Sequence, residues 1–278
     1  MRHAGQRDSR PRLTVAIMAS VALAGCSGAA AEEAFPEVAD RPVRAVDFSF
    51  EHQAADVGTI VPGVTNEGTA RVAVSIVTLG GGRAILADGV EGGFGLRFPA
   101  FDSDVSPTAA AVVVRSLDAP DALSPGRQDF RFGADFALDR LSAGSSTDNG
   151  DNLVQRGLSE DAQQFKIQVD HGVPSCRVAG TDGIAFVESD LVVPERWYRV
   201  ACLRNVDGLV LTVLRWNGTR WGGAHVSRMS AVTGSLEFDG SAGPLMIGAK
   251  VDAAGTLIAS ASDQFNGTVD NVHFEVIP

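Results

Sequence analysis

Three tryptophans and one arginine are the residues whose types and spacing best suit binding chemistry. Trp197, Trp216 and Trp221 are the only tryptophans in the sequence, and Arg199 lies two residues after the first of them. Flat aromatic rings beside a hydrogen-bonding cation suit the apolar faces of sugar rings. If these four side chains share one face of a β-sheet, they form a platform for carbohydrate. The alternative is that the indoles fill the core.

Two turn signals define the strands that would carry these side chains. Asp207-Gly208 and Asn217-Gly218 lie between apolar runs, and each supplies the positive φ angles of a two-residue hairpin turn. We therefore predict a three-stranded meander from Trp197 to Trp221. Alternation along its strands places the three tryptophans and Arg199 on one face and Tyr198 on the other.

The rest of the chain also reads as β-strands. The sequence has 31 glycines and 12 prolines between short apolar runs, and no apolar pattern keeps a 3.6-residue period for three turns. Asp129–Leu138 and Val272–Val276 alternate apolar and polar residues, which is typical of strands with one buried face. No second linker interrupts the strand signals that begin at Arg44, so we predict one domain over residues 44–278.

The N-terminal residues indicate export. Residues 1–12 are rich in arginine, and residues 13–24 are apolar but too short to span a bilayer of about 30 Å. Leu23-Ala24-Gly25-Cys26 resembles the bacterial lipobox, which implies cleavage before Cys26 and a lipid on its thiol. We predict a signal peptide over residues 1–25, a flexible tether over 26–43, and a place in the bacterial cell envelope outside the cytoplasm. An ordinary secretion signal or a membrane-anchoring helix is the alternative.

The two remaining cysteines are predicted to form a disulfide. Lipidation of Cys26 would leave Cys176 and Cys202 as an even pair in a compartment where disulfides persist. The bridge would close a loop of some two dozen residues, which stabilises the fold by roughly 3 kcal/mol. The alternative is two buried free thiols.

The negative charge of the chain argues against two classes of partner, nucleic acids and anionic lipid headgroups. Without residues 1–25, which hold four of the 23 basic and one of the 34 acidic residues, the formal net charge is −14. Nucleic acids and anionic lipid headgroups both require a basic surface. Any membrane attachment would therefore come from the acyl chains on Cys26, since two or three chains hold a protein firmly.

Several blocks of the sequence together carry a resemblance to a known family. They are Arg44–Phe50, Phe130–Leu138, Asn152–Gly157, Trp197–Ala201, Leu209–Gly218, Leu245–Gly248 and Phe265–Val272. In this order they resemble laminin G-like domains, which belong to the concanavalin A-like jelly rolls. The resemblance implies an all-β, two-sheet antiparallel jelly-roll sandwich over nearly the whole mature chain, and this fold carries lectins, adhesion modules and glycan-cleaving enzymes.

The signals for catalysis are weak. Jelly-roll hydrolases place two carboxylates around a glycosidic bond, commonly from a Glu-x-Asp-x-Glu strand. The nearest set, Glu188, Asp190 and Glu195, reads as a solvated acidic loop beside Pro194. Jelly-roll lyases use a tyrosine and a histidine, but the only tyrosine is predicted on the face opposite the tryptophans.

An oxygen-rich loop is the candidate for a metal. Laminin G-like domains often hold calcium at the sandwich rim, and Asp148 and Asp151 in the run Asp148-Asn149-Gly150-Asp151-Asn152 supply hard oxygen ligands. The alternative is a polar turn that holds no metal.

These features together predict a lipid-anchored binding module rather than an enzyme. Its expected partner is carbohydrate or a surface protein, bound through a face or rim of the sandwich. A polysaccharide-cleaving enzyme of the same fold is the first alternative, and a structural component of the envelope is the second.

Overall fold

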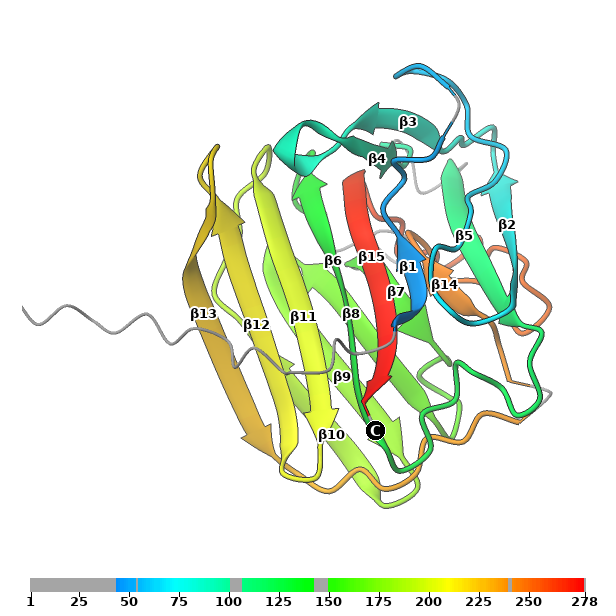
Figure 1. Ribbon diagram of the computed structural model, residues 1–278, viewed down its shortest axis with the longest axis vertical. Helices are drawn as coiled ribbons and strands as arrows, with labels where there is room; N and C mark the ends of the chain where they lie inside the picture. The colour runs from blue at the N-terminus through cyan, green and yellow to red at the C-terminus, as the bar shows by residue number, and fades with distance from the viewer. Residues whose placement is uncertain (1–43, 54, 101–106, 143–149, 240–241, 278) are drawn as a thin grey trace, which may run out of the picture. The chain divides into compact units, whose positions relative to one another are not determined.

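The fold is a two-layer sandwich of antiparallel β-sheets (Figure 1). The computed structural model describes residues 44–53, 55–100, 107–142, 150–239 and 242–277. These residues form fifteen strands and one short 3-10 turn, η1 (Val90–Gly92). The predicted all-β, two-sheet jelly roll is confirmed. Within the described ranges no helix is long and apolar enough to cross a membrane.

One layer, which we call sheet A, has eight strands and contains both the first and the last strand of the chain. β1 pairs with β15, with Val46 opposite Phe274. The strand order is β13 (Trp221–Ser230), β12 (Gly208–Trp216), β11 (Trp197–Asn205), β6 (Asp129–Leu138), β15 (Gly267–Ile277), β4 (Phe94–Arg97) and β3 (Ile85–Asp88), with β1 (Arg44–Phe48) at the side of β15.

The other layer, sheet B, has seven strands and lies behind sheet A in the view of Figure 1. Its strand order is β10 (Gly183–Glu188), β9 (Val173–Gly180), β8 (Gln164–Asp170), β7 (Asp151–Arg156), β14 (Leu245–Ile247), β5 (Ala109–Ser116) and β2 (Val72–Leu79). Neighbours in both sheets are hydrogen-bonded, so each outer face is a continuous surface on which side chains of adjacent strands form rows.

Phenylalanines fill the space between the sheets. The alternation along β6 turns Phe130 and Phe132 inward, and both are fully buried. The ring of Phe165 from β8 lies 4.9 Å from that of Phe132 and 5.3 Å from that of Phe274, centroid to centroid. Burial of each such ring stabilises the fold by roughly 1.5–3 kcal/mol, so these side chains fix which face of each strand points inward.

A disulfide links the two sheets. Cys176 of β9 in sheet B is bonded to Cys202 of β11 in sheet A, and both residues are fully buried. The predicted bridge is confirmed, and the alternative of two free thiols is wrong. Because β11 also carries Trp197 and Arg199 on its opposite face, the bridge anchors the strand that bears the candidate site.

Candidate binding site at one end of sheet A

The three tryptophans lie in one cross-strand row on the outer face of sheet A. Trp216 pairs with Trp221 across β12 and β13, and the register of β11 against β12 brings Trp197 beside Trp216. Burial alternates along β11, so that Tyr198 is buried while Trp197 and Arg199 are half-buried. The predicted division of these side chains between two faces is confirmed, and the indoles do not fill the core.

Both hairpin loops differ from the predicted two-residue turns at Asp207-Gly208 and Asn217-Gly218. Asn205 pairs with Gly208, so the first loop is Val206-Asp207, and the second loop spans residues 217–220. Each closing strand therefore pairs two residues away from the predicted register. A shift of two residues leaves every side chain on its predicted face. The three tryptophans therefore share one face although both predicted registers were wrong.

Asparagine side chains explain why these loops form where they do. The Oδ1 atom of Asn205 accepts hydrogen bonds from the backbone N–H groups of Asp207 at 3.0 Å and Gly208 at 3.1 Å. The Oδ1 atom of Asn217 accepts from the N–H groups of Thr219 at 3.0 Å and Arg220 at 2.9 Å. An asparagine that bonds its own backbone two residues on favours a turn at that position over a turn centred on the following glycine.

Trp221 is held from three directions. Its ring lies 5.2 Å from that of Trp216 at an interplanar angle of 53°. The guanidinium carbon of Arg199 lies 4.3 Å from the centroid of the Trp221 ring, and the indole Nε1–H donates to Oε1 of Glu91 at 2.8 Å. Trp221 is therefore fixed in orientation, and it in turn supports Trp216.

Arg199 is itself oriented by a buried carboxylate. Its Nε and Nη2 atoms each donate to an oxygen of Asp135 at 2.7 Å, and Nδ2 of Asn271 donates to Oδ2 of Asp135 at 2.9 Å. Asp135 is only 1% exposed. A two-point arginine–carboxylate pair fixes the plane of the guanidinium group. The geometry gives Arg199 a positioning role beneath Trp221, while its use as a ligand contact stays a prediction.

The turn η1 brings an acidic side chain to the tryptophans. Glu91 has a positive φ of 62° within this turn. The carboxylate of Asp270 accepts hydrogen bonds from the backbone N–H groups of Val90 at 3.2 Å and Asn271 at 2.6 Å. A Cβ atom on Gly89 would lie 2.7 Å from Oδ2 of Asp270, so only glycine fits there. Asp270 thus holds the loop that presents Glu91.

The environment of Asp270 changes its acidity. Burial raises the pKa of Asp270 to about 7, and the negative charges of Asp135 and Glu51 act in the same direction. The two backbone N–H groups oppose the change only in part. Asp270 therefore titrates near neutral pH, directly behind the loop that carries Glu91.

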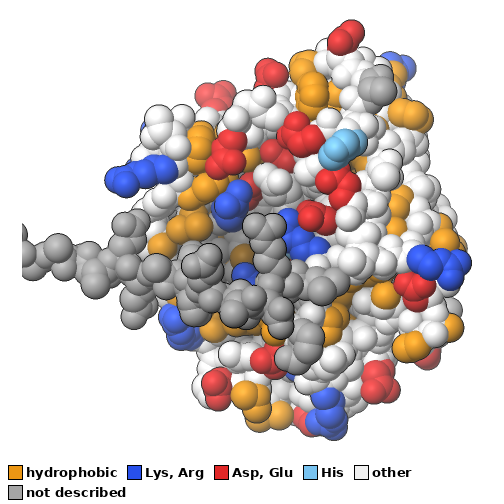
Figure 2. All heavy atoms as spheres, in the orientation of Figure 1, with side chains coloured by type: hydrophobic (Ala, Val, Ile, Leu, Met, Phe, Trp, Pro, Cys, Tyr) orange, Lys and Arg blue, Asp and Glu red, His pale blue; other side chains and the backbone are white. Residues whose placement is uncertain are grey.

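An open groove of about 670 Å³ lies between η1 and the ends of β11 and β12. It is lined by Gly89, Val90, Glu91, Gly92, Trp197, Trp216, Gly218 and Thr219. Figure 2 shows acidic side chains gathered on this face of the molecule near η1 and the adjoining end of β15. The groove offers two indole rings, one carboxylate and one hydroxyl, a set that can stack on a sugar ring and accept hydrogen bonds from its hydroxyl groups.

Sequence reasoning missed Glu91, Asp135 and Asp270. Glu91 lies 130 residues from Trp221 in the chain, and no spacing rule connects them. Asp135 and Asp270 are neighbours across β6 and β15, within strands predicted from their alternation. An acidic residue at an otherwise ordinary outward position of a predicted strand carries no local sign that it will be buried, so no sequence signal could have identified them.

The predicted calcium ligands are only partly described. Asp148 lies outside the described residues. Asp151 is fully buried, and its Oδ1 atom accepts hydrogen bonds from the backbone N–H of Asn266 at 3.1 Å and from its Nδ2 at 2.5 Å. Among the described residues no group of three or more His, Cys, Asp or Glu side chains could hold a metal ion. Calcium binding at this loop remains a prediction.

Cys26 also lies outside the described residues. So do the whole predicted signal peptide and the tether, residues 1–25 and 26–43. Cleavage, lipid attachment and the location in the envelope therefore stay predictions.

Comparison with known proteins gives support at the level of fold. No protein-family model matches the sequence, and no curated protein is significantly similar to it. Among solved structures, the chain is similar to the binding domain of Paraclostridial mosquitocidal protein 1, with a TM-score of 0.51 and 12% identity over 84% of this chain and 49% of that one. The chain thus spans about half the length of that structure.

Two further solved structures are less similar. The binding domain of botulinum neurotoxin DC, in complex with rat synaptotagmin II, gives a TM-score of 0.48 at 8% identity over 84% of this chain and 48% of that one. The LG1-3 region of the laminin α2 chain gives 0.42 at 9% identity over 83% and 64%. The topology, two antiparallel sheets with β1 and β15 paired in one of them, is that of a two-layer jelly-roll sandwich.

Proposed function

We propose that this protein is a lipid-anchored binding module of the bacterial cell envelope that recognises carbohydrate through the groove at the end of sheet A. The observation that carries the proposal is the row of three indoles on an outer sheet face, with Trp197 and Trp216 lining a groove opposite Glu91. A surface protein that inserts a side chain between the rings is the alternative partner.

The rigidity of the row supports a binding role. Trp221 is fixed by Arg199 and Glu91, and Arg199 is fixed by Asp135, so Trp221 and the Trp216 ring packed on it are held in place before a ligand arrives. Side chains that are already ordered lose little conformational entropy on binding. The similar structure from Paraclostridial mosquitocidal protein 1 is itself a binding domain, which agrees with this role.

The contents of the groove favour binding over hydrolysis. Glycoside hydrolysis needs two carboxyl groups on either side of the bond. Glu91 is the one carboxylate among the described residues that line the groove. Asp270 is 2% exposed, and both its oxygens accept backbone hydrogen bonds. It therefore acts on the loop rather than on a ligand.

The geometry also bears on the lyase alternative. Tyr198 is 7% exposed on the core face of β11, where its hydroxyl accepts a hydrogen bond from the backbone N–H of Val193 at 3.1 Å. A catalytic tyrosine must reach the proton it moves. Tyr198 faces away from the groove and cannot do so there.

A glycan array probed with the mature protein tests the proposal. We expect binding to a defined set of glycans, and at least a tenfold weaker affinity for Trp216→Ala, because the ring that lines the groove is lost. Val226→Ala on β13 is the matched control, since it trims a half-exposed side chain on the same sheet away from the groove. An unchanged affinity in Trp216→Ala, with the protein folded, would refute the site.

The enzyme alternative has its own test. The purified protein is incubated with the glycans that bind on the array, and reducing ends and unsaturated uronates are measured. We expect neither to accumulate. Sustained release that Glu91→Gln abolishes would replace the binding proposal with a catalytic one.

The lipid anchor is tested separately. Cys26→Ala should move the protein from the membrane fraction to the soluble fraction, because the thiol that would carry the acyl chains is gone. Cys176→Ala, which removes a disulfide cysteine, should remain in the membrane fraction. Persistent membrane association of Cys26→Ala would contradict lipidation.

A further inference from the structure

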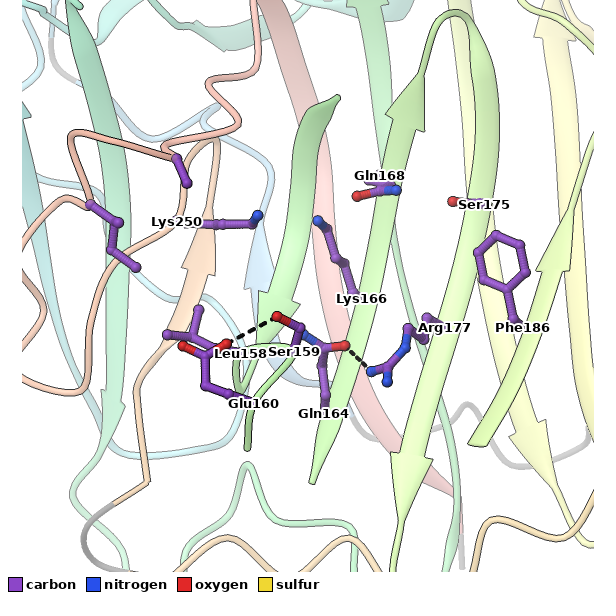
Figure 3. Close-up of a pocket in the computed structure, with 12 residues that line it drawn as sticks. Leu158, Ser159, Glu160, Gln164, Lys166, Gln168, Ser175, Arg177, Phe186 and Lys250 are labelled. Atoms are coloured by element: carbon purple, nitrogen blue, oxygen red, sulfur yellow. Dashed lines mark hydrogen bonds between the residues drawn. The ribbon is translucent and has the colours of Figure 1, made fainter. Parts of the chain in front are cut away.

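A second groove lies on the outer face of sheet B and contains both lysines of the chain. Its volume is about 250 Å³, and its floor is formed by β8 and β9. Lys166 comes from β8, whereas Lys250 comes from the segment that follows β14. Figure 3 shows the two side chains pointing toward one another across the groove. The 278-residue sequence has no other lysine, so the fold has brought its only two ammonium groups together.

One carboxylate serves both ammonium groups. Oδ2 of Asp263 lies 3.3 Å from Nζ of Lys166 and 2.5 Å from Nζ of Lys250. Asp263 is 3% exposed, and Lys166 is 8% exposed. Lysine is rarely buried unless it is paired, and among the described residues Asp263 is the carboxylate within ion-pair distance of both ammonium groups. Two ammonium groups therefore share one ion-pair partner in a partly desolvated place.

A third cation lies in the same cross-strand row. Arg177 of β9 is directly opposite Lys166, and its Nη1 atom donates to Oε1 of Gln164. The charged residues lining the groove are Lys166, Arg177, Lys250 and the exposed Glu160. On a chain with a formal net charge of −11, this is a local excess of positive charge.

Burial and the neighbouring positive charge make Lys166 a stronger acid than an ordinary lysine. Burial, together with the positive charge of Lys250, lowers the pKa of Lys166 to about 8, although Asp263 and Asp170 oppose the change. A bound anion would stabilise the ammonium form and raise this pKa again.

The groove continues the cation row with an aromatic ring and uncharged polar groups. Phe186 of β10 is paired with Arg177 and is 41% exposed, which is unusual for a phenylalanine. Gln168 and Ser175 face each other across β8 and β9 and line the same groove. An aromatic face, an amide and a hydroxyl beside cations are the groups that recognise a charged sugar rather than a bare ion.

We propose that this groove binds an anionic sugar residue, placing its carboxylate or sulfate against Lys166 and Lys250 and its ring toward Phe186. The volume is smaller than the ~300–1,000 Å³ of pockets for drug-sized ligands, so one sugar residue fits and the chain of a polysaccharide extends over the open side. The site lies on the other sheet from the tryptophan groove and does not depend on it. The protein would then hold two glycan sites of different chemistry on opposite faces.

Titration calorimetry of the mature protein at pH 6.5 tests the proposal. The probes are an oligogalacturonate, a heparin oligosaccharide, a neutral dextran oligosaccharide and inorganic sulfate. We expect saturable binding of at least one anionic oligosaccharide, and no binding of dextran by the Trp216→Ala variant, which lacks a ring of the tryptophan groove. Lys250→Met should weaken that binding at least tenfold, whereas Lys250→Arg, which keeps the charge, should stay within about threefold of the wild type.

Two control variants and one variant within the groove distinguish binding at this site from general electrostatic attraction and from binding at the tryptophan groove. Arg228→Met removes an exposed cation from β13 on sheet A and should leave the affinity unchanged. Trp216→Ala should also leave it unchanged, even if it abolishes glycan binding at sheet A. Phe186→Ala should weaken oligosaccharide binding several-fold while leaving any binding of sulfate unaltered.

Three outcomes would overturn the proposal. The first is that no anionic probe binds, in which case the lysines and Asp263 form only an internal ion-pair cluster. The second is that Arg228→Met weakens binding as much as Lys250→Met, which indicates general electrostatic attraction. The third is that sulfate binds as tightly as the oligosaccharides and Phe186→Ala has no effect, which leaves a site for small oxyanions alone.

Discussion

The outer face of sheet A gathers carboxylates around one arginine, whereas the outer face of sheet B gathers cations around one carboxylate. On sheet A, Asp135 binds Arg199 at two points, Asp270 lies opposite Asp135, and the charge of Glu91 also acts on Arg199. On sheet B, Asp263 is shared by Lys166 and Lys250. The same sandwich therefore presents an aromatic, acidic groove on one side and a cationic groove on the other.

The two clusters also differ in whether their buried cation can lose its proton. An arginine cannot lose its proton in a protein, so Arg199 needs its partner at every pH. Lys166 titrates at about 8 and can become neutral instead. The ion pair on sheet A is therefore suited to holding the tryptophan row in a fixed position. On sheet B, Lys166 can be neutral or charged, and a bound anion would favour its charged form.

The largest effect is expected from removal of the carboxylate on sheet A. Asp135→Asn should lower the free energy of unfolding by about 3–5 kcal/mol, because it removes the buried counter-charge of the half-buried guanidinium group of Arg199. Urea unfolding at pH 7 measures the change. Asp182→Asn is the control, since its pair with Arg127 is exposed and should be worth about 0–1 kcal/mol. Similar losses of unfolding free energy in both variants would show that the pair of Asp135 with Arg199 stabilises the fold no more than an exposed ion pair does.

Titration of Asp270 should give the next effect. The folded-state pKa of about 7 lies above the ordinary value of 3.8, so the folded protein holds this proton more tightly than the unfolded chain between those pH values. Asp270 therefore stabilises the fold below pH 4 and loses that contribution as the pH rises through 7, by up to about 4 kcal/mol.

The comparison of wild type with Asp270→Asn isolates this contribution. The difference in unfolding free energy between the two proteins should change steadily from pH 4 to pH 8 and then level off. Chemical unfolding at each pH gives the values. A difference that does not vary with pH would show that Asp270 is ionised in the fold at all these pH values.

The disulfide links the two sheets, and its removal should lower the free energy of unfolding somewhat less than ionisation of Asp270 does. Cys176→Ala/Cys202→Ala opens a loop with a sequence separation of 26 residues, which lowers the free energy of unfolding by about 3 kcal/mol in the chain-entropy model. Urea unfolding of the double variant and of the reduced wild type should agree. If stability is unchanged, the sheets are held by packing alone.

The smallest effect is expected from removal of the carboxylate on sheet B. Asp263→Asn should destabilise the protein by about 1–3 kcal/mol at pH 6, less than Asp135→Asn, because Lys166 can release its proton. At pH 9 the effect should be smaller still, since Lys166 is then largely neutral in the wild type. An effect larger at pH 9 than at pH 6 would contradict this account of the lysine cluster.

Much of the sandwich could be predicted from local pattern. The alternation in Asp129–Leu138 identified β6, and the turn signals identified β11, β12 and the start of β13. β3, β9 and β10 carried no such signal, because their apolar and polar residues do not alternate cleanly. The exact hairpin registers could not be predicted either, because hydrogen bonds from the loop backbone to Asn205 and Asn217 place the turns differently from the glycine signals.

The sequence by itself determined the two-residue period, and with it the face shared by Trp197, Trp216 and Trp221. This follows from geometry that repeats along a single strand, and an error of two residues does not disturb it. Only the tertiary structure brought Glu91 to Trp221, Asp135 to Arg199 and Asp263 to both lysines. Charged and aromatic side chains from distant segments meet where the packing of the phenylalanine core places their strands, and that packing is a property of the whole chain.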